Sequence, residues 1–366
     1  MKLTWEEVRA RRLARSRLTE RADSVVEAVR ATCGIQAQLQ AAAELGVGIR
    51  TVAATQEDVR RELWELRTLV RTWTLRGTLH LHPADELGLW TAAAAAVLES
   101  GGLGAARRAR LLDAFAEALD GRTLLRAELA DEVARRVGAW AHEPLSSGWA
   151  YLLGDAAAAG ILCHGPPRGA KVTFVRADQW LGHTRSWDRG EARLEAARRL
   201  VRACGPVTER SLLYLGAKGG EARTLLAALR DEFVPVDVEG SAMWLPADDP
   251  GAPEIEPSVR LLPQYDAYVL GFRERDRLVG PAAKELYWDT RWKKEGRYES
   301  PVAFANVLVD GAVAGTWEKR LRGGTLEVEA RLASPLSPEH ARRLAAEAER
   351  VAAILGADSS LVTLCH

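Results

Sequence analysis

The strongest constraint on the fold is an order of elements that the sequence predicts twice. Within residues 121–176, a helix that Thr123 can cap should end near Val137, and a second helix should end near Ala159. Two short β-rich stretches then surround a tight loop at 165–169, which predicts a hairpin. Two helices followed by a two-stranded wing are typical of the winged helix-turn-helix fold.

A similar order recurs after Gly205. One helix is expected up to Leu215, a second up to Leu229, and then a hairpin with its turn at 239–241. The two stretches are barely alike in sequence, so the repeat is one of architecture. Two units of one plan predict a tandem array. The proline-rich stretch 248–257 is expected to be a linker.

We therefore expect an α+β fold, mostly α, with about three tandem winged helix-turn-helix units and a β-rich C-terminal region. The four expected parts are an N-terminal helical and winged-helix region, two winged helices and the β-rich region, at residues 1–120, 121–186, 187–250 and 251–366.

The β-rich C-terminal region carries two hairpin signals. Asp310-Gly311 is a typical tight-turn pair, and Arg322-Gly323-Gly324 predicts a second turn. Pro338 then opens a terminal helix that should reach about Ile354.

The N-terminal region should be mainly helical. Thr4 and Glu7 form a capping-box pattern ahead of a helix that ends near Leu18. Further helices are expected, and a β-branched stretch with a turn at Gly77 predicts one or two strands up to Pro83. The expected helices lie near residues 24–31, 35–45 and 56–66, and the β-branched stretch is 68–82.

Composition does not decide between binding partners. The 366 residues include 50 basic and 50 acidic side chains, so the formal net charge is zero, whereas nucleic-acid-binding proteins are usually positive. The position of the charge therefore matters more than its sum. The basic helix with arginines at 9–17 could be a solvated face or could contact a DNA backbone.

Several classes of site find no support in the sequence. The cysteines form no C-x-x-C pair, and the sequence contains no phosphate-binding, dinucleotide-binding or zinc-protease motif. His80 and His82 alternate on an expected strand, but no third ligand is evident, so we expect no metal and a hydrogen-bonded structural role for His80. Because no apolar run of membrane-spanning length occurs, we expect a cytoplasmic protein without a membrane partner.

Glutamines alternate with apolar residues at Gln36, Gln38 and Gln40. By spacing alone this is the start of an amphipathic helix. On a regular helix Gln36 and Gln38 point about 200° apart and cannot act together. They could converge only at an irregular helix start or in an extended segment.

Four blocks, taken in chain order with the winged-helix array, resemble the AlkZ-like winged-helix DNA glycosylases of the azinomycin-resistance type. The blocks are Gln36-Ala37-Gln38 and residues 71–80, 262–271 and 309–317. The resemblance covers nearly the whole chain. It implies three tandem winged helices in a C-shaped monomer that binds double-stranded DNA without a cofactor. The implied activity is monofunctional excision of N7-alkylated purines, with unhooking of interstrand cross-links or bulky adducts, in repair or self-resistance.

The family's catalytic signature is Gln, an aliphatic residue and Gln, and a related branch has Asp in the second place. Gln36 and Gln38 match the first form, so the resemblance implies a catalytic role for these two residues; Ala37 is the smallest aliphatic residue that fits, and Gln40 has no counterpart. A neutral amide oxygen can orient a water molecule and direct its dipole at a developing positive charge.

DNA contacts are expected from basic side chains near tight turns and aromatic residues. The expected DNA-binding residues are Arg71, Arg76, Lys293, Lys294, Lys319, Arg320 and Arg322. The hairpin 317–324 could equally be an ordinary solvated turn. Folding and packing explain a buried Trp73, in the same block as Arg71 and Arg76, just as well as DNA contact does. The alternative for the whole chain is a non-enzymatic winged-helix DNA-binding regulator, which would normally form a dimer.

Overall fold

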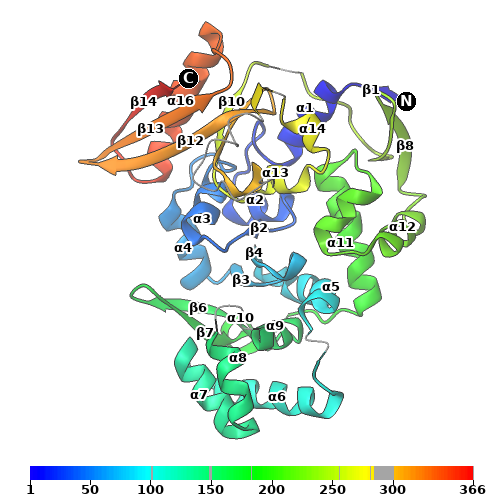
Figure 1. Cartoon of the computed structure of the whole chain (residues 1–366), viewed down its shortest axis with the longest axis vertical. Coiled ribbons are helices and arrows are strands. Elements are labelled where there is room, and N and C mark those ends of the chain that lie inside the picture. Colours follow the sequence, from blue (N-terminus) through cyan, green and yellow to red (C-terminus); the bar gives the residue numbers. More distant parts are fainter. Residues whose placement is uncertain are drawn as a thin grey trace. The chain divides into compact units, whose positions relative to one another are not determined.

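The structure is a computed structural model in which the chain forms two compact units (Figure 1). It describes residues 1–99, 102–147, 151–182, 184–254, 256–280, 282–283 and 301–365. Unit 1 comprises Met1–Val59, Arg199–Ser211 and Leu229–His366, and unit 2 comprises Arg60–Arg198 and Leu212–Ala228. Within the described residues, no helix is long and apolar enough to cross a membrane.

A five-stranded sheet organises the C-terminal part of unit 1. Its strands, in spatial order, are β10 (Val259–Leu262), β11 (Asn306–Val309), β12 (Ala312–Arg322), β13 (Thr325–Leu332) and β14 (Ser359–Cys365). All pairs are antiparallel except β13 and β14, which are parallel. Helix α16 (Pro338–Ile354) lies against this sheet and buries Leu344, Val351 and Ile354 in the main core of the unit.

The local signals in this region are confirmed. Asp310 and Gly311 both have positive φ, 49° and 76°, and turn the chain between β11 and β12. Gly323 and Gly324 connect β12 and β13 in the same way. Ser337 caps α16 through its hydroxyl, with Pro338 in the first turn. Strand β14, after this helix, was not predicted.

Helix α1 (Trp5–Arg15) has the expected capping box of Thr4 and Glu7, but its arginines are not a solvated face. Arg11 pairs with Asp249 at 2.9 Å. Arg12 donates to the carbonyl oxygens of Cys204 and Pro206 at 2.7 and 2.6 Å. The expectation that this cluster is solvated or contacts DNA is wrong for Arg11 and Arg12, because both side chains are buried.

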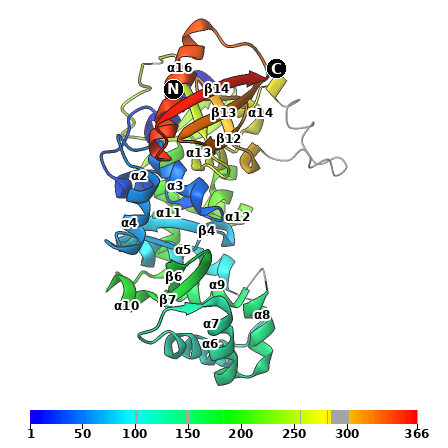
Figure 2. The ribbon, with the colours of Figure 1, turned by 90° about the vertical axis from the view of Figure 1, so that its left-hand side faces the viewer.

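The other elements of unit 1 pack around the five-stranded sheet and helix α1. Strands β1 (Lys2–Leu3), β8 (Phe233–Val238) and β9 (Ser241–Pro246) form a sheet, and short helices surround the core (Figure 2). The helices are α2 (Val25–Ala31), α3 (Gln40–Gly48), α13 (Ala267–Gly271) and α14 (Arg275–Leu278). The hairpin predicted around 239–241 is confirmed as β8 and β9.

Unit 2 contains the first predicted helix, helix and hairpin order. Strand β5 (Leu124–Leu125) precedes α7 (Arg126–Val137), α8 (His142–Ser146) and α9 (Tyr151–Ala158), and β6 (Leu162–Arg168) and β7 (Lys171–Arg176) form the hairpin. The cap at Thr123 is wrong: two strand residues follow it, and α7 begins at Arg126, where Glu128 accepts from the Leu125 amide at 2.7 Å. The sheet order β5-β7-β6 places the short strand beside the hairpin.

The predicted strands before Pro83 are also present in unit 2, as β3 (Leu69–Trp73) and β4 (Leu79–Pro83). They precede α5 (Leu87–Leu98) and α6 (Ala105–Ala118). The remaining elements of the middle region are α4 (Gln56–Trp64), α10 (Ala177–Leu181), α11 (Arg189–Cys204), η4 (Glu209–Leu215) and α12 (Gly219–Ala228).

An ion pair lies at the centre of unit 1. The Arg50 guanidinium donates to both carboxylate oxygens of Asp266, at 2.8 and 2.7 Å, and both side chains are 0% exposed. Arg50 also donates to the Gly46 carbonyl on α3, and Asp266 caps α13 by accepting from the Tyr268 amide. Helices α3 and α13, more than 200 residues apart in the sequence, are thereby held together, and neither charge has access to water.

We expect Asp266→Asn to lower the free energy of unfolding by about 3–5 kcal/mol, because it leaves the buried Arg50 charge uncompensated while preserving side-chain size. Urea unfolding followed by circular dichroism measures the loss. Glu339→Gln, at an exposed pair with Arg342 on α16, is the matched control and should have a much smaller effect. Equal effects of the two variants would contradict a central role for the buried pair.

A second stability prediction concerns His80 and His164 of unit 2. Burial lowers the pKa of both imidazoles well below the usual value, with the positive charges of Arg76 near His80 and Arg71 near His164 acting in the same direction. The native state therefore holds these rings neutral, while the unfolded chain takes up protons below about pH 6.5. Their contribution to stability is present above that pH and is lost as the pH falls below it.

His164→Gln should therefore reduce the slope of unfolding free energy against pH below about pH 6.5, by up to about 1.4 kcal/mol per pH unit. Chemical unfolding at a series of pH values gives that slope. His142→Gln, at an exposed histidine, is the comparison variant. A slope that stays at the wild-type value in His164→Gln would show that the imidazole does not control this titration.

Candidate functional site

The glutamine segment begins where α2 ends. Cys33 and Gly34 both have positive φ, 57° and 95°, and their amides return to the carbonyls of Arg30 and Val29. This left-handed turn stops the helix and makes the following residues extended, as strand β2 (Ile35–Gln36). The helix predicted over 35–45 is therefore wrong in its first part, because α3 starts only at Gln40.

The extended segment presents its two glutamines differently. Gln36 is 8% exposed at the end of β2, and Ala37 behind it is fully buried. Gln38 lies at the following bend and is exposed. Since the segment is not helical, the 200° separation that kept the two amides apart no longer applies.

Gly46 of α3 packs closely against the strand that carries Gln36. A Cβ atom at this glycine would lie 3.6 Å from the Ile35 side chain, 3.6 Å from Pro263 and 3.8 Å from the Asp266 carboxylate. Strand β2, helix α3 and the start of block 262–271 therefore meet at this point. Just after the end of α3, Arg50 joins two of these segments, because it donates both to the Gly46 carbonyl and to Asp266.

Two further hydrogen bonds connect the block 262–271 to the five-stranded sheet and its β11–β12 turn. The Tyr268 hydroxyl donates to the Gly311 carbonyl at 2.8 Å, and the Trp317 indole donates to the Leu262 carbonyl at 2.8 Å. The sequence blocks 262–271 and 309–317 are thus in direct contact. The glutamine segment and the β12–β13 hairpin belong to one packed body.

The β12–β13 hairpin carries three of the predicted DNA-binding residues. Arg320 and Arg322 lie on one face of β12, opposite Glu327 and Thr325, and Arg322 is 3.8 Å from Glu327. Lys319 and Leu321 lie on the other face, which Trp317 shares. Leu321 is 58% exposed near the turn. The predicted Lys293 and Lys294 lie outside the described residues.

Arg71 and Arg76 belong to unit 2 and have internal contacts. Arg71 is 5% exposed and lies 3.5 Å from Nδ1 of His164. Arg76 donates to the Tyr214 carbonyl at 3.2 Å and lies over the Tyr214 ring. Their predicted role in DNA binding stays a prediction.

The histidine pair of β4 has structural contacts. His80 Nδ1 is 3.0 Å from the Thr78 carbonyl, and His82 Nε2 is 2.9 Å from the Thr74 hydroxyl. The His82 ring stacks on Trp90. The hydrogen-bonded role predicted for His80 is confirmed. Across the part of the chain that the structure describes, no group of three potential ligands is placed to hold a metal.

Two residues near the glutamine segment were missed from the sequence. Asp266 lies in the sequence block 262–271, but no local sequence pattern identifies it as the partner of Arg50, 216 residues away. Glu44 is 1% exposed on α3 and accepts a hydrogen bond from Gln40 at 2.9 Å. Glu44 is the single acidic residue among the small and apolar residues 41–48, and this pattern could have indicated a buried carboxylate.

Comparisons with known proteins identify the family of this chain. The AlkZ-like DNA glycosylase family matches residues 29–354. A protein of Streptomyces sahachiroi described as an interstrand DNA cross-link repair glycosylase is 32% identical over 340 residues, which are 87% of this chain and 88% of that protein. The solved structure of DNA glycosylase AlkZ from the same organism superposes with a TM-score of 0.83 at 28% identity, over 100% of both chains. The chain belongs to the AlkZ-like DNA glycosylase family.

Proposed function

We propose that this protein is a monofunctional DNA glycosylase that hydrolyses the N-glycosidic bond of N7-alkylated purines in double-stranded DNA. The observation that carries the proposal is the position of Gln36 and Gln38. They match the family signature, and they stand on a short extended segment held by buried side chains. The relative described as a cross-link repair glycosylase supports extending the substrates to interstrand cross-links and bulky adducts.

The proposed chemistry suits a neutral amide. Alkylation at N7 gives the purine a positive charge, so the base can leave without strong acid assistance. The bond between C1′ and N9 breaks, and its electron pair goes to the base and neutralises that charge. The sugar becomes cationic at C1′, and water adds there and releases one proton to the surrounding solvent.

In this mechanism the two glutamines act on the water and on the developing charge. A glutamine carbonyl oxygen can accept a hydrogen bond from the water and direct its negative end toward C1′. The largely enclosed Gln36 is suited to a fixed orientation, whereas the exposed Gln38 is accessible to substrate. Because an amide is a poor base, undamaged purines with poor leaving ability would react slowly. Selectivity for damaged DNA follows from this limit.

We assign DNA engagement to the β12–β13 hairpin, which projects from the edge of unit 1 (Figure 1). Arg320 and Arg322 would contact phosphates, and Lys319 adds positive charge beside them. The exposed Leu321 between these residues has the character of an apolar wedge that enters a base step beside the lesion. Such contacts read the backbone and the shape of the duplex more than its sequence.

The proposal includes the architecture and setting that the resemblance implies. Strand β5, the helices α7 to α9 and the β6–β7 hairpin support one winged helix. We propose further units of this kind, including one at residues 187–250. We propose that such units form a C-shaped monomer that acts on nucleoid DNA in the cytoplasm, in repair or in self-resistance. No cofactor is needed for the proposed reaction.

The double variant Gln36→Ala/Gln38→Ala should lower the rate of base excision about 100-fold or more, because it removes both amides that place the water. DNA containing N7-methylguanine, cleaved with alkali at the abasic sites produced, reports the rate. DNA affinity should change little, since the glutamines do not hold the backbone.

Gln56→Ala is the matched control, because Gln56 is a hydrogen-bonded glutamine near the surface on α4. Near wild-type excision by the double variant would remove the two glutamines from the mechanism. Absence of excision by the wild-type protein would favour the non-enzymatic DNA-binding regulator instead.

The double variant Arg320→Gln/Arg322→Gln should flatten the plot of log affinity against log salt by about 2 units, near one for each lost phosphate contact. Binding to damaged and undamaged duplexes, measured by fluorescence anisotropy, should lose the same amount. Arg342→Gln/Arg343→Gln on α16 removes two exposed arginines elsewhere and should keep the wild-type slope. Equal slopes in both double variants would place the DNA-binding surface away from this hairpin.

A further inference from the structure

One residue beside the glutamine segment has a backbone conformation that is unusual for its side chain. Residues 264 and 265 form the turn between β10 and α13, and Tyr265 has a φ of 58°, in the left-handed region. Glycine or asparagine is favoured at such a turn position, because a larger side chain brings Cβ too close to the backbone. An aromatic residue in this conformation costs stability, so its presence calls for a further explanation.

The other long side chains at left-handed positions have contacts within the protein. They form ion pairs, hydrogen bonds or stacking contacts, and they belong to Arg17, Arg67, Arg76, Glu239 and Asp310. Tyr265 differs from them. Across the described residues its side chain makes no hydrogen bond and no ring contact, and the residue is only half-buried. Hydrogen bonding and ring stacking within the fold therefore give no reason for a tyrosine here.

The turn that carries Tyr265 lies against the glutamine segment. Side-chain atoms of Ile35 and Asp266 lie 3.6 and 3.8 Å from the Cβ position at Gly46 of α3. Ile35 directly precedes Gln36, and Asp266 directly follows Tyr265. Tyr265 and Gln36 are therefore each one residue away from side chains that meet at a single point. Since consecutive Cα atoms are about 3.8 Å apart, both residues are near enough to contact the same nucleotide.

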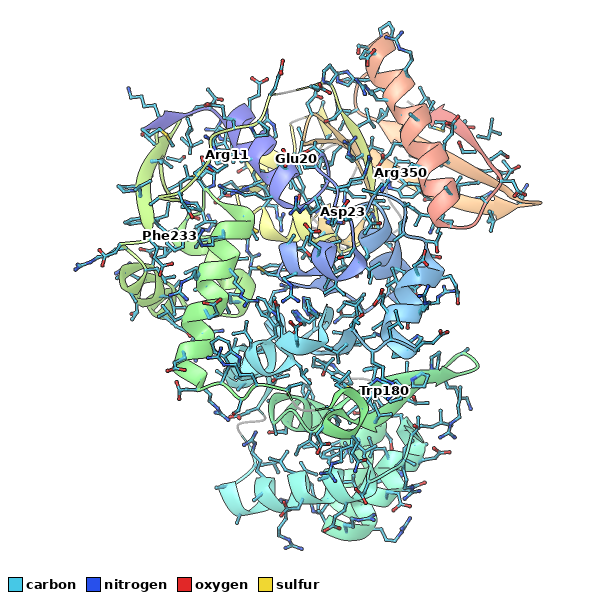
Figure 3. All side chains as sticks on the ribbon, turned by 180° about the vertical axis from the view of Figure 1, so that it is seen from behind. Arg11, Glu20, Asp23, Trp180, Phe233 and Arg350 are labelled. Atoms are coloured by element: carbon cyan, nitrogen blue, oxygen red, sulfur yellow. The ribbon has the colours of Figure 1, made fainter. Side chains whose placement is uncertain are left out.

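The backbone of this turn is fixed on both sides. The Tyr265 amide donates to the Val302 carbonyl at 2.7 Å, and the next residue, Asp266, is held in its buried ion pair. Helix α3 is fixed as well, because Arg350 of α16 donates to the carbonyl of Gly48, its last residue, at 3.0 Å (Figure 3). A ring on a rigid turn can contact a substrate with little loss of conformational freedom.

We propose that Tyr265 contacts the substrate directly, with its ring stacked on the alkylated purine. The proposal rests on the proposed glycosylase function and deepens it, because it assigns the contact that distinguishes the damaged base. Alkylation at N7 makes the purine cationic, and the negative face of an aromatic ring attracts a cation. A neutral purine stacks on the same ring with less attraction. Tyr265 thus adds a selection at binding to the selection that the weakly basic amides make in the chemical step.

Two variants separate the ring from the turn. Tyr265→Asn removes the ring and keeps a residue that tolerates the left-handed backbone, whereas Tyr265→Phe keeps the ring. Tyr265→Asn should excise N7-methylguanine about tenfold more slowly in single turnover, while its urea midpoint equals or exceeds that of the wild type. Tyr265→Phe should stay within about threefold of the wild-type rate. Tyr151→Asn, at a tyrosine of unit 2 that is 68% exposed, is the matched control and should excise at the wild-type rate.

Binding without excision gives a second readout, measured by fluorescence anisotropy in the Gln36→Ala/Gln38→Ala background. With Tyr265 in place, a duplex containing N7-methylguanine should bind more tightly than an intact duplex. Adding Tyr265→Asn should reduce this preference about fivefold or more, and adding Tyr265→Phe should leave it nearly unchanged. Affinity for the intact duplex should stay the same in both cases, because the ring does not hold the DNA backbone.

Excision by Tyr265→Asn at the wild-type rate would overturn the proposal. A lowered urea midpoint with an unchanged lesion preference would also overturn it, because the ring would then serve the fold only. Equal losses in Tyr265→Asn and Tyr265→Phe would assign the effect to the hydroxyl and reject stacking. A wild-type protein that excises no alkylated base would reject the glycosylase function, whereas the lesion preference in binding would still decide whether Tyr265 contacts the damaged base.

Discussion

The pairing of Arg50 with Asp266 is the interaction on which the rest of unit 1 depends. Two opposite charges without solvent access stabilise each other only if both are held in place, so neither segment can shift without a large cost. Arg50 follows α3 directly, and Asp266 opens α13. The pair therefore positions the helix after the glutamines against a block more than 200 residues later, and that block reaches the sheet through Tyr268 and Trp317.

Much of the fold could be predicted because its signals are local. The Asp310-Gly311 turn, the Ser337 cap and the Thr4–Glu7 capping box each follow from one or a few neighbouring residues. The start of α3 could not be predicted in this way. The apolar and glutamine pattern at 35–45 suits a helix, yet the left-handed turn at Cys33-Gly34 and the packing of Ile35 against α3 make its first residues extended.

From the sequence, the catalytic role of Gln36 and Gln38 could be predicted only through the resemblance to a known family. Spacing alone favoured an ordinary helix at the glutamines, and the extended backbone that gives them a different geometry arises from tertiary contacts. Arg50 and Asp266 lie 216 positions apart, so no local pattern joins them. What the sequence did contain was an acidic residue in an apolar helix, which is a reason to look for a buried partner.

The zero net charge does not show where positive charge is exposed on the structure. Many arginines serve as internal hydrogen-bond donors: Arg12 and Arg350 donate mainly to backbone carbonyls, and Arg11 and Arg50 to buried carboxylates. A planar guanidinium with several donors suits this work, because it satisfies several acceptors in a fixed geometry. Arginines paired with buried carboxylates, such as Arg11 and Arg50, add to the charge sum but little to the surface potential. For such a chain the few basic side chains that remain exposed, such as those of the β12–β13 hairpin, determine how DNA can be held, and the overall composition does not.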